Sequence, residues 1–186
     1  MGGATSADYA WLSDRWTDGV GTTVLCITFV RDLSPADALR RIKVIPGTRG
    51  DFNVAAYAAR GGTVLTDTGW ATKYVSNLAE PLSLGTAVAM VFANVEDSDF
   101  TYRVNDRLIT TFGLYGYRYR YREGDDPDRL LADVRELGLY DAGDGYHEDP
   151  IPGALALASR ATGVHLSRAH YARPALTGST DHLMEG

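Results

Sequence analysis

Two long, uninterrupted apolar runs constrain the fold of this chain more than any other feature. They are residues 24–30, with Thr28 inside the run, and residues 87–93, which lie within a predicted strand over residues 86–95. The first run is rich in β-branched and aromatic side chains. A strand with one solvated face alternates apolar and polar residues, whereas a strand covered on both faces is apolar throughout. Both runs fall far short of the ~20 residues needed to cross a bilayer. They therefore predict two central strands of a sheet that is buried on both faces.

Three shorter segments predict further strands, at residues 63–66, 98–104 and 107–112. The last two form a hairpin across Asn105 and Asp106, residue types that tolerate the positive φ of a tight turn. Strands and helices are partly segregated along the chain instead of alternating strictly, which favours an α+β fold. We expect a single α+β domain over residues 1–174, with a mixed or antiparallel sheet of about five strands and packed helices.

Helices are indicated mainly by their ends. Ser34 supplies an N-cap and Pro35 a first helical residue, and Gly163 ends an alanine-rich helix over residues 152–162. Another helix is predicted from Asp51 through the alanines that precede a glycine pair. Residues 175–186 carry no such pattern and are expected to form a flexible C-terminal tail.

Composition narrows the class of protein. The 186 residues include 18 Lys+Arg and 24 Asp+Glu, a formal net charge of −6. This acidic balance disfavours binding to nucleic acid, whose phosphates would be repelled by much of the surface. No leader or membrane-spanning segment is apparent in the sequence, so we expect a cytoplasmic protein without a membrane partner. The only lysines are Lys43 and Lys73, a skew toward arginine that indicates a GC-rich genome.

Sequence motifs for the common catalytic chemistries are missing. No dinucleotide fingerprint, phosphate loop, nucleophile elbow or zinc-protease motif is present, so the sequence predicts no cofactor. The four histidines do not pair at metal-ligand spacing, and no metal is expected. Cys26 lies inside an apolar strand, where burial raises the pKa of a thiol, so it is expected to fill the core.

Tyrosine and arginine alternate over residues 115–122. In an extended segment, Tyr115, Tyr117 and Tyr119 share one face with Tyr121, and Arg120 lies on the other face between Arg118 and Arg122. One interpretation is an extension of the preceding hairpin, with half-covered tyrosines and solvated arginines. The other is an exposed binding face, because tyrosine and arginine are enriched where partners bind. We take the binding face as the working hypothesis.

A second candidate site follows the strand at residues 63–66. Trp70 comes directly after a glycine turn at the strand end, with Asp67 close by in the sequence. A tryptophan in this position could line a ligand pocket or cover the core. We include Asp67 and Trp70 among the candidate ligand-binding residues.

Several segments together resemble a known family. They are residues 26–41, the Gly69-Trp70 turn, and residues 85–94, 126–130 and 154–164. In order and spacing they resemble an actinobacterial family known as domain of unknown function 6461, over about residues 9–170. The resemblance implies an actinobacterial source and a single domain, but no catalytic residues. The chain departs from the family pattern at residues 115–122.

Two hypotheses for function remain at this point. The first is a non-catalytic binding or accessory domain that recognises a protein or a small molecule through residues 115–122 and the Trp70 turn. The alternative is a small cofactor-independent enzyme of specialised metabolism, such as a cyclase, isomerase or hydrolase, whose acid and base groups leave no motif. A pocket holding Asp67, a tyrosine and a histidine would favour the enzyme. A homodimer is left open.

Overall fold

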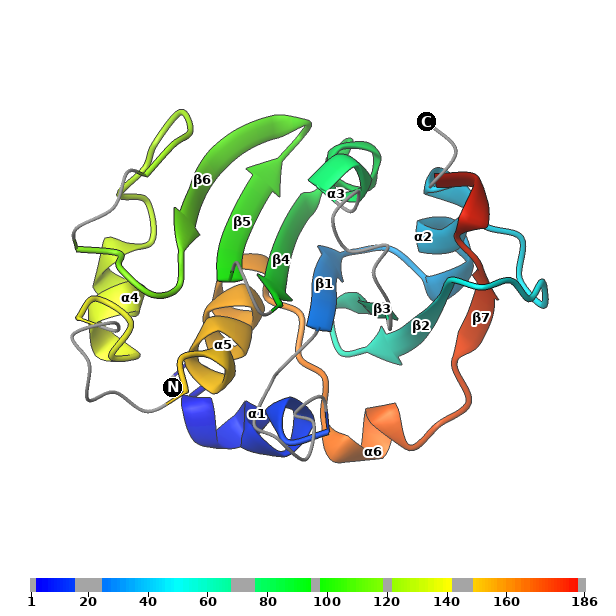
Figure 1. The fold of residues 1–186 in the computed structure, drawn as a ribbon, viewed down its shortest axis with the longest axis horizontal. Coiled ribbons are helices and arrows are strands. Elements are labelled where there is room, and N and C mark those ends of the chain that lie inside the picture. The colour runs from blue at the N-terminus through cyan, green and yellow to red at the C-terminus, as the bar shows by residue number, and fades with distance from the viewer. Residues whose placement is uncertain are drawn as a thin grey trace.

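A computed structural model describes residues 3–15, 25–67, 76–94, 98–118, 122–141 and 149–183. Within them, seven strands form one antiparallel sheet in the order β6-β5-β4-β1-β3-β2-β7 (Figure 1). The strands are β1 (Leu25–Arg31), β2 (Asn53–Ala59), β3 (Gly62–Asp67), β4 (Ala87–Ala93), β5 (Ser98–Val104), β6 (Arg107–Gly113) and β7 (Leu176–Ser179). The helices are α1 (Ser6–Ser13), α2 (Pro35–Arg41), α3 (Ser76–Ser83), α4 (Leu131–Glu136), α5 (Ile151–Thr162), α6 (Arg168–Tyr171) and the 3₁₀ helix η2 (Asp181–Leu183). The α+β prediction is confirmed, with seven strands where about five were expected.

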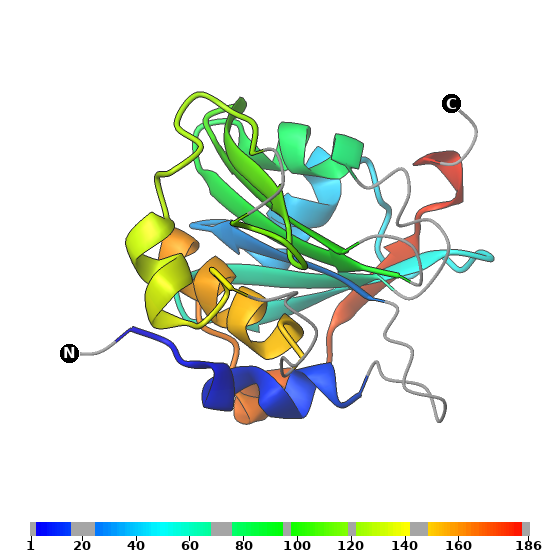
Figure 2. The ribbon, with the colours of Figure 1, turned by 60° about the vertical axis from the view of Figure 1, so that its left-hand side comes forward.

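Helices cover both faces of the sheet (Figure 2). On one face α5 packs over β4 and β1, and α1 packs against α5. On the other face α2 lies over β2 and β3, while α3 lies over β4. Each face has its own buried apolar cluster. We call the one around Phe29 and Leu157 the α1–α5 cluster, and the one around Leu39 and Leu82 the α2–α3 cluster. None of the helices described is long and apolar enough to cross a membrane.

The two apolar runs do form central strands. β1 lies in the middle of the sheet between β4 and β3, and every residue from Leu25 to Val30 is buried. Its alternate side chains serve different clusters: Ile27 and Phe29 pack toward α5, whereas Cys26 and Val30 pack toward α2. Because both faces of the strand are covered, an apolar residue is favoured at every position.

The local turn and cap signals are also confirmed. Asn105 and Asp106 have φ of 49° and 66° in the β5–β6 turn. The Ser34 side chain accepts a hydrogen bond from the Asp37 backbone N–H at 3.2 Å, with Pro35 as the first residue of α2. α5 ends at Gly163, whose φ of 73° closes the helix.

The helix predicted from Asp51 was wrong, because this segment forms β2. Val54 and Ala56 face the α2–α3 cluster, and Tyr57 and Ala59 face the α1–α5 cluster. The glycine pair does not end a helix: Gly61, with φ of 83°, turns the chain from β2 directly into β3. Alanine favours helices by less than about 1 kcal/mol per residue, so pairing of β2 with strands on both sides outweighs its preference.

The prediction of a flexible tail over residues 175–186 was wrong for residues 176–183. β7 pairs with the outer edge of β2, and the Asp181 carboxylate then accepts the backbone N–H of Phe52 at 2.8 Å. At Gly178, β7 also lies close to the segment that follows α2. A Cβ at this position would lie 2.4 Å from Val44 Cγ1 and 2.7 Å from the Ile45 carbonyl oxygen, so a glycine is needed there. A short polar strand of this kind carries little apolar signal of its own.

Candidate functional site

The predicted binding residues do not all lie within the described structure. Trp70, Tyr119 and Arg120 lie outside the described residues. The other three are Asp67, Tyr115 and Tyr117, and they occupy quite different environments.

Tyr117 is part of the core, so the prediction that it is exposed was wrong. Its side chain is 1% exposed and packs edge-on against Phe112, with ring centroids 4.6 Å apart. The Arg122 guanidinium covers the ring at 4.7 Å from its centroid. The segment from Leu114 to Arg118 bends and turns, and Gly116 has φ of 135°. A period-two pattern holds only in an extended chain, so it fails here.

Tyr115 is exposed, as predicted, with 51% of its surface open to solvent. Partial burial raises the pKa of the Tyr115 hydroxyl, and the nearby Asp149 carboxylate raises it further. Asp149 accepts hydrogen bonds from Ser13 at the end of α1 and from the first N–H of α5. The role of Tyr115 in binding stays a prediction.

Asp67 ends β3 and lies deep in the sheet. It is 4% exposed and pairs across the sheet with Cys26 and Val54, on the face covered by α2 and α3. Burial raises the pKa of the Cys26 thiol, and the Asp67 carboxylate raises it further. Strands β1, β4 and β5 separate β3 from β6, which places Asp67 about 19 Å from the end of β6 at the usual strand spacing. Asp67 and Tyr115 therefore do not form one site.

A tyrosine and a histidine do meet, but on the opposite face from Asp67. The Tyr9 hydroxyl lies 3.4 Å from His165 Nδ1, and Tyr9 is completely buried. Burial raises the pKa of the Tyr9 hydroxyl. The pair connects α1 to the segment before α6 and is closed to solvent on the tyrosine side. It does not assemble the pocket that would favour an enzyme.

The structure brings together a cluster of aromatic rings that the sequence analysis missed. Tyr57 of β2 stacks on Tyr171 of α6, with ring centroids 4.5 Å apart. Trp11 of α1 contacts Tyr171 edge-on at 5.4 Å. Partial burial raises the pKa of Tyr57 to about 12, and the neighbouring Tyr171 adds to the shift. Three separate elements thus contribute one ring each to the cluster, in which Trp11 is buried and Tyr57 and Tyr171 are half-buried.

Arginine side chains cover these rings. The Arg15 guanidinium lies 5.1 Å from the centroid of Tyr171, and that of Arg168 lies 5.6 Å from Trp11. Arg60 exchanges two backbone hydrogen bonds with His165, just before α6, and the Arg173 backbone N–H donates to the His170 carbonyl at 3.1 Å. All four arginines are exposed, and in the described part of the chain none of them forms an ion pair. The nearby acids on α1 are Asp8, whose carboxylate is held by Thr5, and Asp14.

We call this region the α1–α6 surface and define it by the three rings and four arginines. Its members are Trp11, Arg15, Tyr57, Arg60, Arg168, Tyr171 and Arg173. The sequence carried one signal for it: residues 167–173 hold two arginines, a histidine and a tyrosine in an acidic chain. The contributions from α1 and β2 are distant in sequence, and the segment from Asp51 was predicted as a helix. The cluster was therefore not predictable from local patterns.

His170 organises the short helix that carries Tyr171 and Arg168. Its Nδ1 accepts the backbone N–H of Ser167 at 3.3 Å, while the Ser167 hydroxyl accepts the His170 backbone N–H at 3.2 Å. This reciprocal capping box fixes a four-residue helix that could not persist alone. Burial lowers the pKa of His170, and the charges of Arg173 and Arg60 lower it further.

Among the residues described, no group of three His, Cys, Asp or Glu side chains is placed to hold a metal ion. The α1–α6 surface offers instead guanidinium donors and aromatic faces. Such groups bind carboxylates and phosphates through paired N–H donors, and apolar groups through stacking.

The fold and this surface define an α+β protein with one antiparallel sheet and a cationic, aromatic surface formed by α1, β2 and α6. The chain belongs to the family of unknown function DUF6461, which matches residues 52–177. The matched region runs from the start of β2 into β7 and includes Tyr57, Arg60, Arg168, Tyr171 and Arg173. No curated protein and no solved structure matches the chain.

Proposed function

We propose that this protein is a non-catalytic binding domain that recognises an acidic segment of a partner protein through the α1–α6 surface. The observation that carries the proposal is a stack of three aromatic rings on which two exposed arginines, Arg15 and Arg168, lie without ion pairs in the described structure. Two further exposed arginines, Arg60 and Arg173, lie beside His165 and His170 next to it. These positive charges are concentrated on one surface, although the whole chain has a net charge of −6. A cytoplasmic location in an actinobacterium is part of the same proposal.

The physical basis is the geometry of a stacked guanidinium. An arginine that lies over an aromatic ring keeps its N–H donors at the edge of the guanidinium plane, pointing away from the ring. Arg15 and Arg168 are held in this way over Tyr171 and Trp11. The rings restrict the two side chains before a ligand arrives, which lowers the entropic cost of binding a carboxylate.

The overall charge favours a short acidic segment over a long polyanion. A nucleic acid would extend beyond the α1–α6 surface and meet the acidic remainder of the protein. A protein segment can confine its carboxylates to the arginines and place an apolar side chain on Tyr57 or Tyr171. Tyrosine, tryptophan and arginine are the residues most often found at the centre of such interfaces. No observation in the described structure favours the alternative of a cofactor-independent enzyme.

The test uses a fluorescein-labelled glutamate-rich peptide, whose binding is measured by fluorescence anisotropy at low ionic strength. Arg168→Glu should weaken binding at least tenfold, because it replaces an attraction with a repulsion at the centre of the surface. The affinity of the wild type should also fall as salt is added.

Arg135→Glu is the matched control. Arg135 is likewise exposed and stacked on a tyrosine, 5.0 Å from the centroid of Tyr140, but it belongs to α4. Both substitutions change the net charge by −2, so only a local effect can separate them. Equal weakening by the two variants would contradict the proposal. Binding of single-stranded DNA or ATP through Arg168, without binding of the peptide, would overturn the choice of a protein segment.

A further inference from the structure

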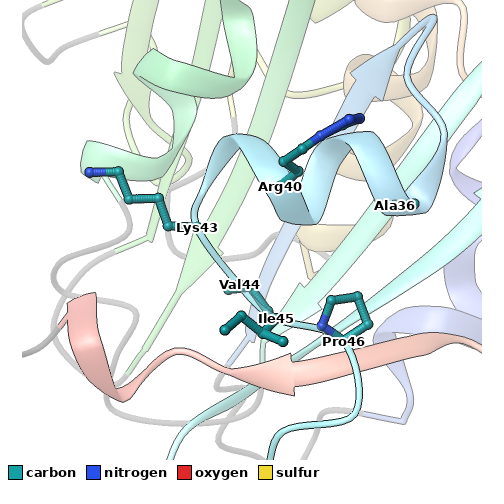
Figure 3. Close-up of a pocket in the computed structure, with 6 residues that line it drawn as sticks. All are labelled: Ala36, Arg40, Lys43, Val44, Ile45 and Pro46. Atoms are coloured by element: carbon teal, nitrogen blue, oxygen red, sulfur yellow. The ribbon is translucent and has the colours of Figure 1, made fainter.

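A second unusual surface lies on the opposite face of the sheet. A depression of about 440 Å³ is lined by α2 and the residues that follow it, namely Ala36, Arg40, Lys43, Val44, Ile45 and Pro46 (Figure 3). Ile45 is 68% exposed, the largest exposed fraction among the large apolar side chains of the described residues. Leu176 of β7 is 40% exposed and lies on the face of the sheet that α2 covers, since it pairs with Ala56. We call these seven residues the α2–β7 surface.

The exposure of Ile45 is fixed by the backbone around it. The Val44 N–H bonds to the Leu39 carbonyl at 2.9 Å, and the Gly47 N–H bonds to Thr177 of β7 at 2.8 Å. The Thr48 hydroxyl donates to the Ile45 carbonyl at 2.7 Å. The segment is thus held on both sides and cannot turn Ile45 inward without losing these bonds. Its apolar side chain is preorganised for a partner.

Positive charges border the apolar residues. In Figure 3, Arg40 and Lys43 extend away from Ile45 and Pro46 in different directions. Arg40 pairs with Asp37 within α2, whereas Lys43 and Arg49 form no ion pair in the parts of the chain that are described. An occupant complementary to this arrangement places an apolar side chain on Ile45 and carboxylates opposite Lys43.

We propose that the α2–β7 surface docks an amphipathic acidic segment of a partner protein, anchored by an apolar side chain against Ile45. A second copy of this chain fits less well, because a two-fold contact at Ile45 would bring Lys43 and Arg40 close to their own copies. The inference is independent of the α1–α6 surface, which lies on the other face of the sheet.

The test measures the backbone amide chemical shifts of the ¹⁵N-labelled full chain by NMR. The chain is titrated with a short capped peptide in which two leucines alternate with two glutamates. The amides of residues 43–47 and 176–178 should shift. Ile45→Asp should weaken this binding at least tenfold, a loss of about 1.4 kcal/mol or more, because it removes the anchor and adds a like charge. Leu84→Asp is the control, since Leu84 is 50% exposed but does not line the depression.

Each other outcome contradicts the inference. Equal binding of a leucine–lysine peptide would show that charge complementarity plays no part. Shifts confined to α6 would support the α1–α6 surface and overturn this one. The absence of shifts at millimolar peptide would exclude the docking site. Self-association in sedimentation that Ile45→Asp abolishes would mean that a second copy covers the surface instead.

Discussion

Tyr115 and Tyr117 are two residues apart and differ sharply in their expected contribution to stability. Tyr117 is almost completely buried against Phe112, whereas half of Tyr115 is exposed. Tyr117→Ala leaves a cavity in the core, so it should lower the free energy of unfolding by about 3–5 kcal/mol. Tyr115→Ala should lower it by about 0.5 kcal/mol or less. Urea denaturation of both variants measures the difference.

Tyr117→Phe separates the ring from its hydroxyl. The hydroxyl lies 3.5 Å from an Asp128 carboxylate oxygen, which is too long for a strong hydrogen bond. We therefore expect this variant to lose less than about 1 kcal/mol. Similar losses in Tyr115→Ala and Tyr117→Ala would contradict the burial of Tyr117. The alternation of tyrosine and arginine predicts an extended segment with both rings on one face. It could not show that the chain turns at Gly116 and directs one ring into the core.

At the scale of elements, α6 should respond to pH through its cap. Nδ1 of His170 accepts the Ser167 N–H only when that nitrogen carries no proton. Burial, together with Arg173, His165 and Arg60, lowers the pKa of His170 below its ordinary 6.5. The unfolded chain therefore binds the proton more tightly than the folded protein. The stability from this cap is complete above about pH 6.5 and declines as the pH falls through the lowered pKa.

His170→Gln removes the titration and keeps an acceptor at the same position of the capping box. The free energy of unfolding, measured by urea denaturation between pH 5 and 7.5, should fall less with acid in this variant than in the wild type. His182→Gln, in η2, controls for loss of a histidine. NMR titration of the His170 ring checks the cause directly, and a pKa at or above 6.5 would refute the explanation.

The elements also show where sequence patterns reach their limit. β1 and β4 were predictable because two-sided burial requires apolar residues throughout, and the β5–β6 turn because Asn105 and Asp106 tolerate positive φ. β2 pairs with β3 over residues 54–59 and with β7 over residues 53–56. The sequence does not indicate that pairing, because the alanines of β2 favour a helix and β7 is short and polar. The α1–α6 surface needs β2 in place, so it could not be predicted either.

At the scale of the whole molecule, one sheet supports two cores. The α1–α5 cluster and the α2–α3 cluster lie on opposite faces of the sheet, and the central strands contribute alternate side chains to both. β1, for example, places Phe29 in one cluster and Val30 in the other. Loss of either cluster would leave the central strands with one bare apolar face. This sharing should make the two sides of the sheet unfold together.

Leu157→Ala and Leu39→Ala test that coupling, because each leucine is fully buried in a different cluster. Each substitution should lower the free energy of unfolding by about 2–5 kcal/mol. In both variants, urea unfolding followed by far-ultraviolet circular dichroism should remain a single transition. Amide exchange should show the most protected residues of α2 and α5 opening with the same free energy. Separate transitions, or early exchange of α2 alone in Leu39→Ala while α5 stays protected, would show that the α2–α3 side unfolds independently.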